Sequence, residues 1–538
     1  MPPRARKDRS GVIACVPQPT HVTTRAGALT LSSDSTLAAA DGAAARLLRS
    51  RIRSSTGFEL REGGEDATIR LVLDPQASGN SPERYQISVE RKRALIVAAH
   101  PIGLMNGVQT FFQLLPPEVF SPVVVVRPWA IPLVEIDDAP CFGWRGFLID
   151  VSRHFFPSEF LFRLVDLLSM HKLNVLHLHL NDDQGWRFPS EAFPRLVEIG
   201  SRRRETRIGR ERDRSRPGPQ FDGTPHGGFY TRDQLRALVS YAAERNVTVM
   251  PEIDLPGHAQ AAIAAYPELG HVGSIEVATH WGISPHVLNL SDATVTFCKT
   301  VWNEVLDVFP SPFVHIGGDE CPRDEWRKSR IAKSRLESLG LTNEDALQNW
   351  FTAEISAHLL NVGRHPIGWD EILEGGALPV GASVMSWRGE SGGIAAAKAG
   401  VDVVMSPEVP CYLDHYQSDD PNEPLAIGGR NTLEDVFGWN PVPGLLDADE
   451  ARSILGAQCN LWTEYVPDPK AVEYMAFPRA SAFAEVAWGA FSGDFGEFAS
   501  RLARHLDRLE ALKVNYRPLD GTQPSQQGGS GARRRFDR

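Results

Sequence analysis

The sequence lacks the features that would assign this 538-residue chain to a membrane or secreted class. No apolar run approaches the ~20 residues needed to cross a bilayer; even the four valines 123–126 stand between prolines. Proline also interrupts the basic N-terminus before the 7–15-residue apolar segment of a secretory signal can form. These absences predict no membrane partner and a cytoplasmic location.

Cysteine pairs, nucleotide-binding loops and a basic charge balance are absent too. The six cysteines contain no CxxC pair, so they predict neither a zinc site nor a disulfide framework, and we expect most of them in the core: Cys15, Cys141, Cys298, Cys321, Cys411 and Cys459. There is no GxGxxG fingerprint after the first predicted barrel strand and no P-loop. Lys and Arg total 56 against 67 Asp and Glu, a formal charge of −11, which argues against nucleic acid as a partner. A small neutral substrate and no cofactor are expected.

Composition divides the chain into two folded parts between two tails. Residues 1–10 and 517–538 are rich in small or polar residues and are expected to be disordered. Residues 11–138 contain short alternating runs (67–74, 85–90 and 94–99) and then a helical pattern (103–115), which predicts a small α+β domain. Residues 139–516 are predicted to form the larger, catalytic domain with a C-terminal helix.

The second part alternates short apolar strands with amphipathic helices. Eight strands are predicted, at 146–151, 174–180, 247–253, 313–318, 365–369, 383–387, 402–406 and 454–462. Helices are predicted at 158–171, 231–245, 291–308, 343–362, 391–399 and 468–487, with Ser158 as an N-cap and a Thr231/Gln234 capping box. Eight βα units favour a (β/α)8 TIM barrel. An open doubly wound sheet is the alternative fold.

Polar and aromatic residues follow every predicted strand. The active site of such a barrel lies at the C-terminal ends of its strands. In chain order they are Arg153, Asp182, His258, Asp319, Glu320, Trp369, Trp387, Tyr412, Asp414, Trp462 and Glu464. Tryptophan faces stack on the C–H surfaces of a sugar, while carboxylates and arginine bind its hydroxyl groups. This combination predicts a glycoside hydrolase.

The carboxyl pair itself narrows the chemistry. Asp319 and Glu320 are neighbours, with Cα atoms ~3.8 Å apart, so they are poorly placed to face each other across an anomeric carbon. A substrate that carries its own nucleophile, such as a 2-acetamido group, removes this difficulty. One carboxylic acid then protonates the leaving group while its neighbour holds the acetamido nitrogen.

At this point a resemblance becomes specific. The motifs DVSRHF, HLHLNDDQGWR, PEIDLPGH, HIGGDE, GWDEIL, VMSWRG and LWTEY, in this order, resemble those of the β-N-acetylhexosaminidases of glycoside hydrolase family 20. The similarity covers roughly residues 11–516, including an N-terminal α+β domain of the kind that precedes the barrel in this family. It implies exo-acting, retaining hydrolysis of terminal β-linked GlcNAc, with GalNAc as a second candidate sugar, through an oxazolinium-type intermediate.

The resemblance also implies a role for each matched residue. Glu320 would be the general acid/base, Asp319 would orient the acetamido group and stabilise its positive charge, and Tyr412 would donate to the acetamido oxygen. Arg153, Asp414 and Glu464 would bind the sugar hydroxyls, and Asp182 with His258 would position Glu320. Among the tryptophans, Trp369, Trp387 and Trp462 would form the pocket walls, and Trp439 would lie on the aglycone side.

Two other functions remain open at this stage. His177 and His179 form an HxH pattern on a barrel strand, which is also how a metal-dependent amidohydrolase begins. Later strand ends offer aromatic residues and carboxylates instead of further histidines, so we expect this pair to pack or hydrogen-bond inside the barrel. A catalytically silent carbohydrate-binding barrel is the third hypothesis, although pure binding would not require an acid. Glu252 and Asp254 are interpreted as structural groups at the barrel rim. The oligomeric state is not predicted.

Overall fold

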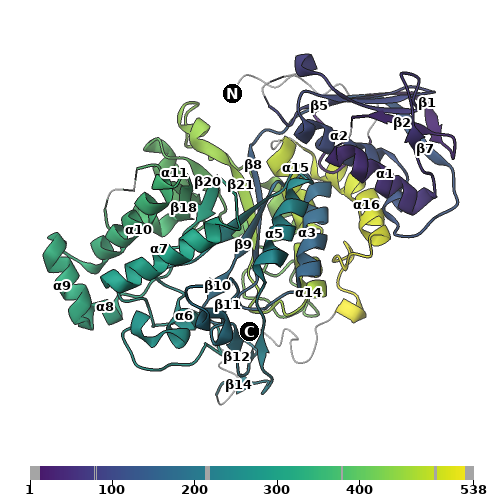
Figure 1. The fold of residues 1–538 in the computed structure, drawn as a ribbon. Coiled ribbons are helices and arrows are strands. Elements are labelled where there is room, and N and C mark those ends of the chain that lie inside the picture. Colours follow the sequence, from purple (N-terminus) through teal and green to yellow (C-terminus); the bar gives the residue numbers. More distant parts are fainter. Residues whose placement is uncertain are drawn as a thin grey trace.

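The computed structural model describes residues 13–526 apart from 41, 78, 80, 212–217, 377, 379 and 490–492. A seven-stranded sheet lies beside a closed barrel of eight strands, and helices fill the space between them (Figure 1). This arrangement confirms the predicted fold class, a TIM barrel preceded by a small α+β domain.

The first domain is a mixed sheet with helices on one face. Its strands, in the spatial order β1-β7-β5-β6-β4-β2-β3, are β1 (His21–Leu31), β7 (Trp129–Asp138), β5 (Tyr85–Val89), β6 (Ala94–Ala98), β4 (Ile69–Leu73), β2 (Thr36–Ala39) and β3 (Arg61–Glu62). Helix α2 (Pro101–Leu114) packs on β5 and β6, and α1 (Ala43–Thr56) packs beside α2. Alternate residues of β5 and β6 are buried, as expected of strands with one covered face.

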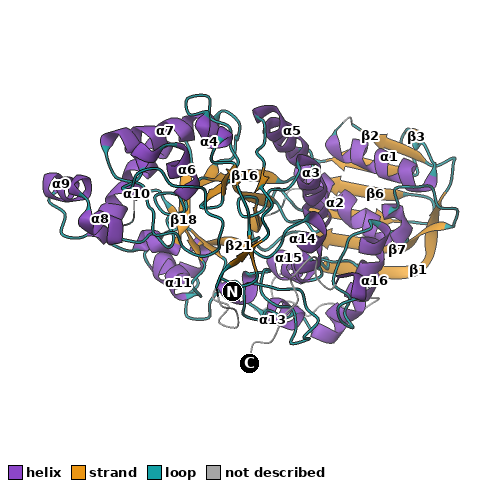
Figure 2. Cartoon of the chain, turned by 90° about the horizontal axis from the view of Figure 1, so that it is seen from below, coloured by secondary structure: helices purple, strands orange, loops and turns teal. Residues whose placement is uncertain are grey.

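The barrel strands coincide with the eight predicted ones. They are β8 (Trp144–Asp150), β9 (Val175–His179), β16 (Thr248–Glu252), β17 (Phe313–His315), β18 (His365–Trp369), β19 (Ser383–Ser386), β20 (Val403–Met405) and β21 (Ile454–Leu461). All neighbouring pairs are parallel, and β21 closes the ring on β8 with Gly456 opposite Trp144. Seen from below, the strands form a central ring with helices outside (Figure 2).

The helices around the barrel largely follow the predicted pattern. They are α3 (Ser158–Met170), α5 (Arg232–Ala243), α7 (Asp292–Leu306), α10 (Glu344–Asn361), α11 (Ser391–Lys398), α14 (Pro469–Ala476), α15 (Arg479–Gly489) and α16 (Phe495–Ala511). The Thr231/Gln234 capping box is confirmed. The Ser158 N-cap is wrong: Pro157 holds that position and Ser158 begins the helix. The single helix predicted over 468–487 is two helices, since Pro478 lacks the N–H that a continuous helix needs.

Short elements occupy the loops between these strands and helices. The helices are α4 (Arg195–Glu198), α6 (Gln260–Ala265), α8 (Asp324–Lys328), α9 (Arg330–Leu339), α12 (Glu408–Cys411) and α13 (Leu433–Gly438). Three small hairpins follow β9: β10 (Asn181–Asp182) with β11 (Gly185–Trp186), β12 (Arg202–Arg203) with β15 (His226–Gly227), and β13 (Arg207–Ile208) with β14 (Gln220–Phe221). The β10–β11 hairpin carries Asp182 over the barrel mouth.

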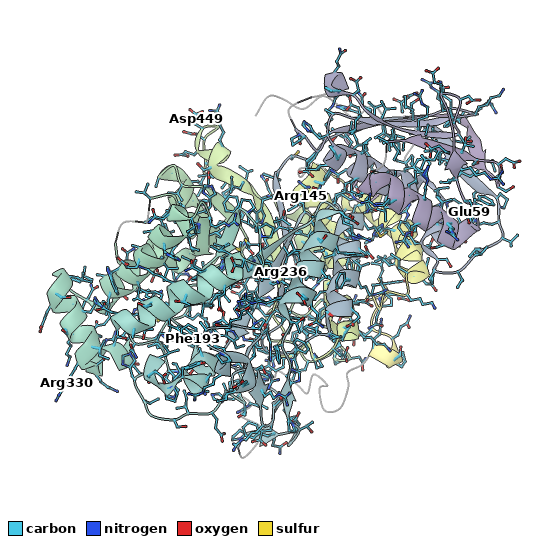
Figure 3. The ribbon with its side chains drawn as sticks, in the orientation of Figure 1. Glu59, Arg145, Phe193, Arg236, Arg330 and Asp449 are labelled. Atoms are coloured by element: carbon cyan, nitrogen blue, oxygen red, sulfur yellow. The ribbon has the colours of Figure 1, made fainter. Side chains whose placement is uncertain are left out.

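Buried ion pairs join the two domains. Lys172 Nζ lies 3.2 Å from Asp138 Oδ2 and 2.7 Å from the hydroxyl of Tyr85, and both charged side chains are fully buried. Arg145, at the start of β8, contacts Glu83 at 2.5 Å, and Figure 3 labels it where the barrel meets the sheet domain. Buried charges of this kind persist only when they are paired, so these contacts fix how the domains meet.

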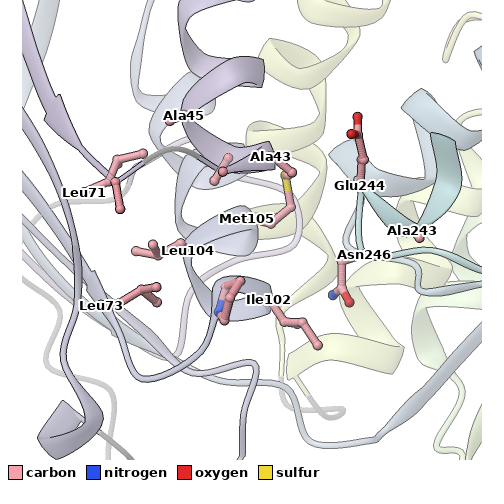
Figure 4. A pocket seen from close by; sticks show the side chains of 14 residues that line it. Ala43, Ala45, Leu71, Leu73, Ile102, Leu104, Met105, Ala243, Glu244 and Asn246 are labelled. Carbon is pink, nitrogen blue, oxygen red and sulfur yellow. The ribbon is translucent and has the colours of Figure 1, made fainter. Parts of the chain in front are cut away.

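A cavity of about 160 Å³ also lies at this junction (Figure 4). Its lining is mostly apolar and includes Leu71, Ile102 and Met105 from the first domain, with Glu244 and Asn246 from the barrel side. None of the residues predicted for the active site lines it, so this cavity is separate from the barrel mouth.

The C-terminal segment differs from its prediction. Residues 517–526 were expected to begin a disordered tail, but Arg517 donates to Glu423 at 2.7 Å and Thr522 hydrogen-bonds to Tyr474 at 2.6 Å. These side-chain contacts hold the segment against the barrel. Residues 1–10 and 527–538 lie outside the described residues. No helix of the described chain is both long and apolar enough to cross a membrane.

The six cysteines differ in burial. Cys15, Cys298, Cys411 and Cys459 are buried, Cys321 is partly buried and Cys141 is exposed. The expectation that most of them are core residues is therefore confirmed.

Candidate active site

The predicted site residues gather at the C-terminal ends of the barrel strands. Together they come from segments that follow or end all eight strands: Arg153 after β8, Asp182 after β9, His258 after β16, Asp319 and Glu320 after β17, Trp369 at the end of β18, Trp387 after β19, Tyr412 and Asp414 after β20, and Trp462 and Glu464 after β21. Parallel strands end at one face of a barrel, so the side chains meet there although they are up to 311 positions apart in sequence, from Arg153 to Glu464.

Two glycines allow the acidic pair to leave β17 in its observed direction. Gly317 and Gly318 have φ values of +66° and +102°, which residues with a Cβ rarely adopt. A Cβ on Gly317 would lie 1.8 Å from Asp254 Oδ1, and the Gly318 N–H donates to that same oxygen at 2.9 Å. In the HIGGDE motif, Gly317 is therefore required by the close approach of Asp254, and Gly318 is favoured by its positive φ.

Asp254 and Asp319 place their carboxyl groups close together, with oxygen atoms within 4.8 Å of each other. Burial raises the pKa of Asp254 to about 7, and burial followed by the Asp254 charge raises the pKa of Asp319 well above its ordinary range. Oδ2 of Asp254 and Oδ1 of Asp319 are buried, and neither accepts a hydrogen bond from an N–H or hydroxyl group of the described residues. Two such carboxyl groups can bond to each other only by sharing a proton. The sequence interpretation of Asp254 as a structural rim residue missed this contact.

His258 lies between a buried aspartate and the acidic pair. Its Nδ1 is 3.2 Å from Asp182 Oδ1, and its Nε2 is 3.6 Å from Glu320 Oε2 and 3.7 Å from Asp319 Oδ2. Burial alone would lower the pKa of His258, but Asp182 outweighs it and holds the pKa well above its ordinary value. A cationic imidazole therefore faces both carboxyl groups. The Glu320 side chain is 36% exposed, which leaves it open to a ligand.

Arg153 contacts the same Asp182 carboxylate as His258 does. Its guanidinium contacts Asp182 at 2.7 Å and Asp150 at 3.3 Å, and it lies 5.1 Å from the centre of the Trp462 ring. Burial acts to lower the pKa of Arg153, but Asp182 and then Glu464 raise it well above its usual value. The residue is therefore a fixed cation that can bind sugar hydroxyl oxygens.

Two further carboxyl groups belong to the same site. Burial raises the pKa of Asp414 to about 7, and the nearby charge of Glu464 adds to this effect. Burial also raises the pKa of Glu464, whereas Arg153 opposes the rise. Carboxyl groups in this state can both accept and donate hydrogen bonds, as binding to hydroxyl groups requires.

The aromatic residues form a connected group around Tyr412. The Tyr412 ring is stacked with Trp387 at 6.2 Å and lies 6.4 Å from Trp462. Burial raises the pKa of Tyr412 well above its ordinary value, so the hydroxyl keeps its proton and can donate. Trp369 lies 5.8 Å from Trp462 but is only 1% exposed, which makes it the most enclosed of these rings.

Trp439 is placed apart from this group. It follows α13, donates its indole N–H to Glu390 at 3.3 Å and packs against the hydrophobic cluster beneath α11. Within the described chain, no recorded ring contact joins it to the other site tryptophans. The aglycone-side position of Trp439 stays a prediction.

Glu371 is a site residue that the sequence interpretation missed. It accepts a hydrogen bond from Trp387 Nε1 at 2.9 Å. Burial, and then the charge of Asp319, raise its pKa to about 8. Its place in the GWDE motif, two residues after Trp369, was the available signal.

The HxH histidines hydrogen-bond inside the barrel, as expected. His177 Nδ1 accepts from Gln458 at 3.0 Å, while His179 uses both ring nitrogens, one toward Glu252 and one toward Asp182. Ligand atoms of His177, Glu252 and His315 lie within 4.8 Å of one another, as a metal site would need. Within this group, Glu252 lies 3.1 Å from His177 and 2.9 Å from His315, whereas His179, which is outside the group, has both ring nitrogens engaged.

A TIM barrel whose mouth combines carboxyl groups, a fixed arginine and tryptophans has the layout of a glycoside hydrolase. Comparison with known proteins agrees. The model of "Glycosyl hydrolase family 20, catalytic domain" matches residues 142–490, and that of "Glycosyl hydrolase family 20, domain 2" matches residues 12–139. The chain therefore belongs to glycosyl hydrolase family 20, and it is a glycoside hydrolase.

Individual relatives are similar over most of the chain. A beta-hexosaminidase of Porphyromonas gingivalis is 42% identical over 495 residues, which are 90% of this chain but only 61% of that protein. An exo beta-N-acetylglucosaminidase of Vibrio harveyi, solved with N-acetylglucosamine, has a TM-score of 0.81 at 29% identity and covers 95% of this chain and 79% of its own. A mutant beta-hexosaminidase of Streptomyces plicatus, solved with the product GlcNAc, has a TM-score of 0.80 at 30% identity, covering 94% and 96%.

Proposed function

We propose that this chain is an exo-acting, retaining β-N-acetylhexosaminidase that releases terminal β-linked GlcNAc, with GalNAc as a second substrate. The observation that carries the proposal is the adjacent pair Asp319 and Glu320, in which Asp319 lies close to the Asp254 carboxyl group while Glu320 lies open beside His258. The names of the relatives, all hexosaminidases or N-acetylglucosaminidases, support it.

The two carboxyl groups then act on different atoms of the substrate. Glu320 protonates the glycosidic oxygen as the bond breaks and later removes a proton from the attacking water. The acetamido oxygen attacks C1, and positive charge develops on the acetamido nitrogen. That charge favours the ionised form of Asp319, with the proton held by Asp254, whose pKa of about 7 suits this exchange.

Tyr412 and the tryptophans align the nucleophile. The Tyr412 hydroxyl keeps its proton and donates to the acetamido oxygen, while Trp387 and Trp462 enclose the group on either side of that ring. Holding the amide oxygen close to C1 replaces an external nucleophile and lowers the entropic cost of attack. The acetamido oxygen displaces the leaving group with inversion at C1, and water then opens the intermediate with a second inversion, so the β configuration is retained.

Arg153, Asp414 and Glu464 bind the ring hydroxyl groups of the terminal sugar. The fixed cation and two carboxyl groups of raised pKa offer both donors and acceptors to hydroxyls at the closed end of the pocket. A pocket closed by such contacts admits a chain end and not a chain interior, which supports exo cleavage.

The test compares aryl β-GlcNAc with aryl β-glucoside, each with and without EDTA. We expect turnover of the GlcNAc substrate to exceed that of the glucoside by at least about 100-fold, because an aligned internal nucleophile is worth several orders of magnitude. EDTA is expected to change neither rate. Equal rates on both substrates would contradict participation of the acetamido group, and binding without turnover would favour the silent sugar-binding barrel.

A further inference from the structure

A chain of ionic contacts runs through the barrel interior beneath the active site. Its deepest member is Glu252, a fully buried carboxylate at the end of β16. Four ring nitrogens from three other strands surround it: His179 Nδ1 at 2.6 Å, His315 Nδ1 at 2.9 Å, Trp369 Nε1 at 3.0 Å and His177 Nε2 at 3.1 Å. Contacts of this number stabilise a carboxylate that has no access to water.

His179 connects this carboxylate to the active site. Its Nδ1 contacts Glu252 and its Nε2 lies 2.8 Å from Asp182 Oδ2, so each nitrogen faces a carboxylate and carries a proton. Trp462 contacts the ring edge-on at 4.9 Å and brings no charge. Burial acts to lower the pKa of His179, but Glu252 and then Asp182 raise it well above its ordinary value. The side chain is a cation held between two anions.

The alternation of charge continues to the catalytic pair. Asp182 contacts His258, whose Nε2 lies 3.6 Å from Glu320 Oε2, and it also holds Arg153 at 2.7 Å. Burial would raise the pKa of Asp182, but Arg153, His258 and His179 together lower it well below its usual value. Negative and positive side chains therefore alternate from Glu252 to Glu320.

We propose that Glu252 and His179 are positioning residues for the acid step of the hydrolysis. They keep Asp182 ionised, Asp182 keeps His258 cationic, and His258 in turn orients the Glu320 carboxyl toward the leaving oxygen. This inference rests on the proposed hydrolase function, because it assigns Glu320 the transfer of a proton to the leaving group.

The physical reason is the charge balance of the buried contacts. In His179→Gln the cation is replaced by a neutral side chain, so two buried carboxylates, Glu252 and Asp182, would face each other without a cation between them. One of them would then take up a proton. A protonated Asp182 would hold His258 and Arg153 less strongly, so the effect would reach Glu320 although neither substituted residue touches the substrate.

The test uses phenyl β-GlcNAc, whose leaving group needs protonation, and 3,4-dinitrophenyl β-GlcNAc, whose leaving group does not. The variants are His179→Gln, Glu252→Gln and the double variant, which has lost one positive and one negative charge and is therefore balanced again. His171→Gln is the matched control, since His171 is equally buried but contacts Ser481 and His505 away from the site. The ratio of kcat/KM between the two substrates is measured, because it does not depend on the folded fraction.

We expect His179→Gln to lower kcat/KM for the phenyl substrate by on the order of 10- to 100-fold, part of the 10²–10⁴-fold that a positioned acid contributes. For the dinitrophenyl substrate, kcat/KM should fall by less than about 3-fold, since its leaving group needs little help from an acid. The double variant should lose less than the product of the two single losses, because it restores the charge balance. His171→Gln should leave the ratio unchanged.

Two results would overturn the inference: equal losses on both substrates in His179→Gln, or a double variant that loses the full product. If His179→Gln does not fold, Glu252→Gln, which conserves volume, decides by the same ratio. A wild-type enzyme inactive on both substrates would instead overturn the proposed function, so the two failures are distinguishable.

Discussion

The carboxyl groups of Asp254 and Asp319 lie with oxygen atoms within 4.8 Å of each other at the barrel mouth, although they follow the neighbouring strands β16 and β17 and lie 65 positions apart in the sequence. The contact exists because Gly317 lets the chain pass directly over Asp254. It sets the protonation state of the group that is proposed to face the acetamido nitrogen.

Replacing Asp254 should shift the pH dependence of the reaction. Burial and then the negative charge of Asp254 raise the pKa of Asp319. Asp254→Asn removes this neighbouring negative charge, so Asp319 ionises at lower pH. We expect the acidic limb of the kcat/KM profile on aryl β-GlcNAc to move to lower pH. Glu371→Gln, which removes a more distant carboxyl group, should give a smaller shift in the same direction. An unchanged limb in Asp254→Asn would contradict this coupling between the two carboxyl groups.

Replacing the general acid should affect substrates according to their leaving groups. Glu320→Gln cannot protonate the departing oxygen, so we expect kcat/KM for phenyl β-GlcNAc to fall by about 10³-fold or more. Dinitrophenyl β-GlcNAc should retain far more of its rate. Steady-state kinetics on both substrates checks this, and equal losses would assign Glu320 another role.

Gly317 offers a test of the local geometry. Gly317→Ala places a methyl group against Asp254, whereas Gly340→Ala adds one at the same left-handed φ, +65°, with no atom within 4 Å. Both variants should lose about 1–2 kcal/mol of stability from the backbone conformation alone. Only Gly317→Ala should also lose most of its kcat. Urea unfolding and kinetics on the two proteins measure these effects, and full activity in Gly317→Ala would show that the approach of Asp254 is not needed.

Acid should destabilise the fold through buried histidines. Burial lowers the pKa of His171 to about 4, and it lowers the pKa of His505, which lies 2.9 Å away, well below its ordinary value. Below pH ~6.5 the unfolded chain takes up protons at these sites while the folded chain does not. The contribution of these histidines to the free energy of unfolding is therefore complete above that pH and is lost as pH falls toward 4. Each site adds up to about 1.4 kcal/mol per pH unit to the slope.

His171→Gln should reduce this slope by about one proton. The free energy of urea unfolding at pH 7, 6 and 5 gives the slope, and His100→Gln, at an exposed position before α2, should leave it unchanged. A slope in His171→Gln equal to that of the wild type would mean that His171 titrates normally in the folded protein.

The barrel was predictable because its strands are short buried runs separated by amphipathic helices, a pattern that stands in the sequence itself. The break at Pro478 and the failure of Ser158 as a cap were not recognised, because each depends on one residue overriding a good local pattern. Thr231 succeeded because both partners of its capping box lie within three residues.

The site could be predicted only in part for a related reason. Asp319, Glu320 and the tryptophans stand out by type and by their place after strands. Asp254, Glu252 and Glu371 are carboxyl groups whose importance comes from partners on other strands, Asp319, His179 and Trp387 respectively. Such contacts are created by the closing of the barrel and leave no local pattern.

Participation of the acetamido group is the central claim, and one kinetic series tests it most directly. Aryl β-GlcNAc substrates with zero, one, two or three fluorine atoms on the acetyl methyl group differ in the nucleophilicity of the amide oxygen and little in size. We expect kcat/KM to fall steeply with each fluorine, by several orders of magnitude across the series, since the weakened oxygen is the nucleophile. Rates that stay level across the series would contradict the account.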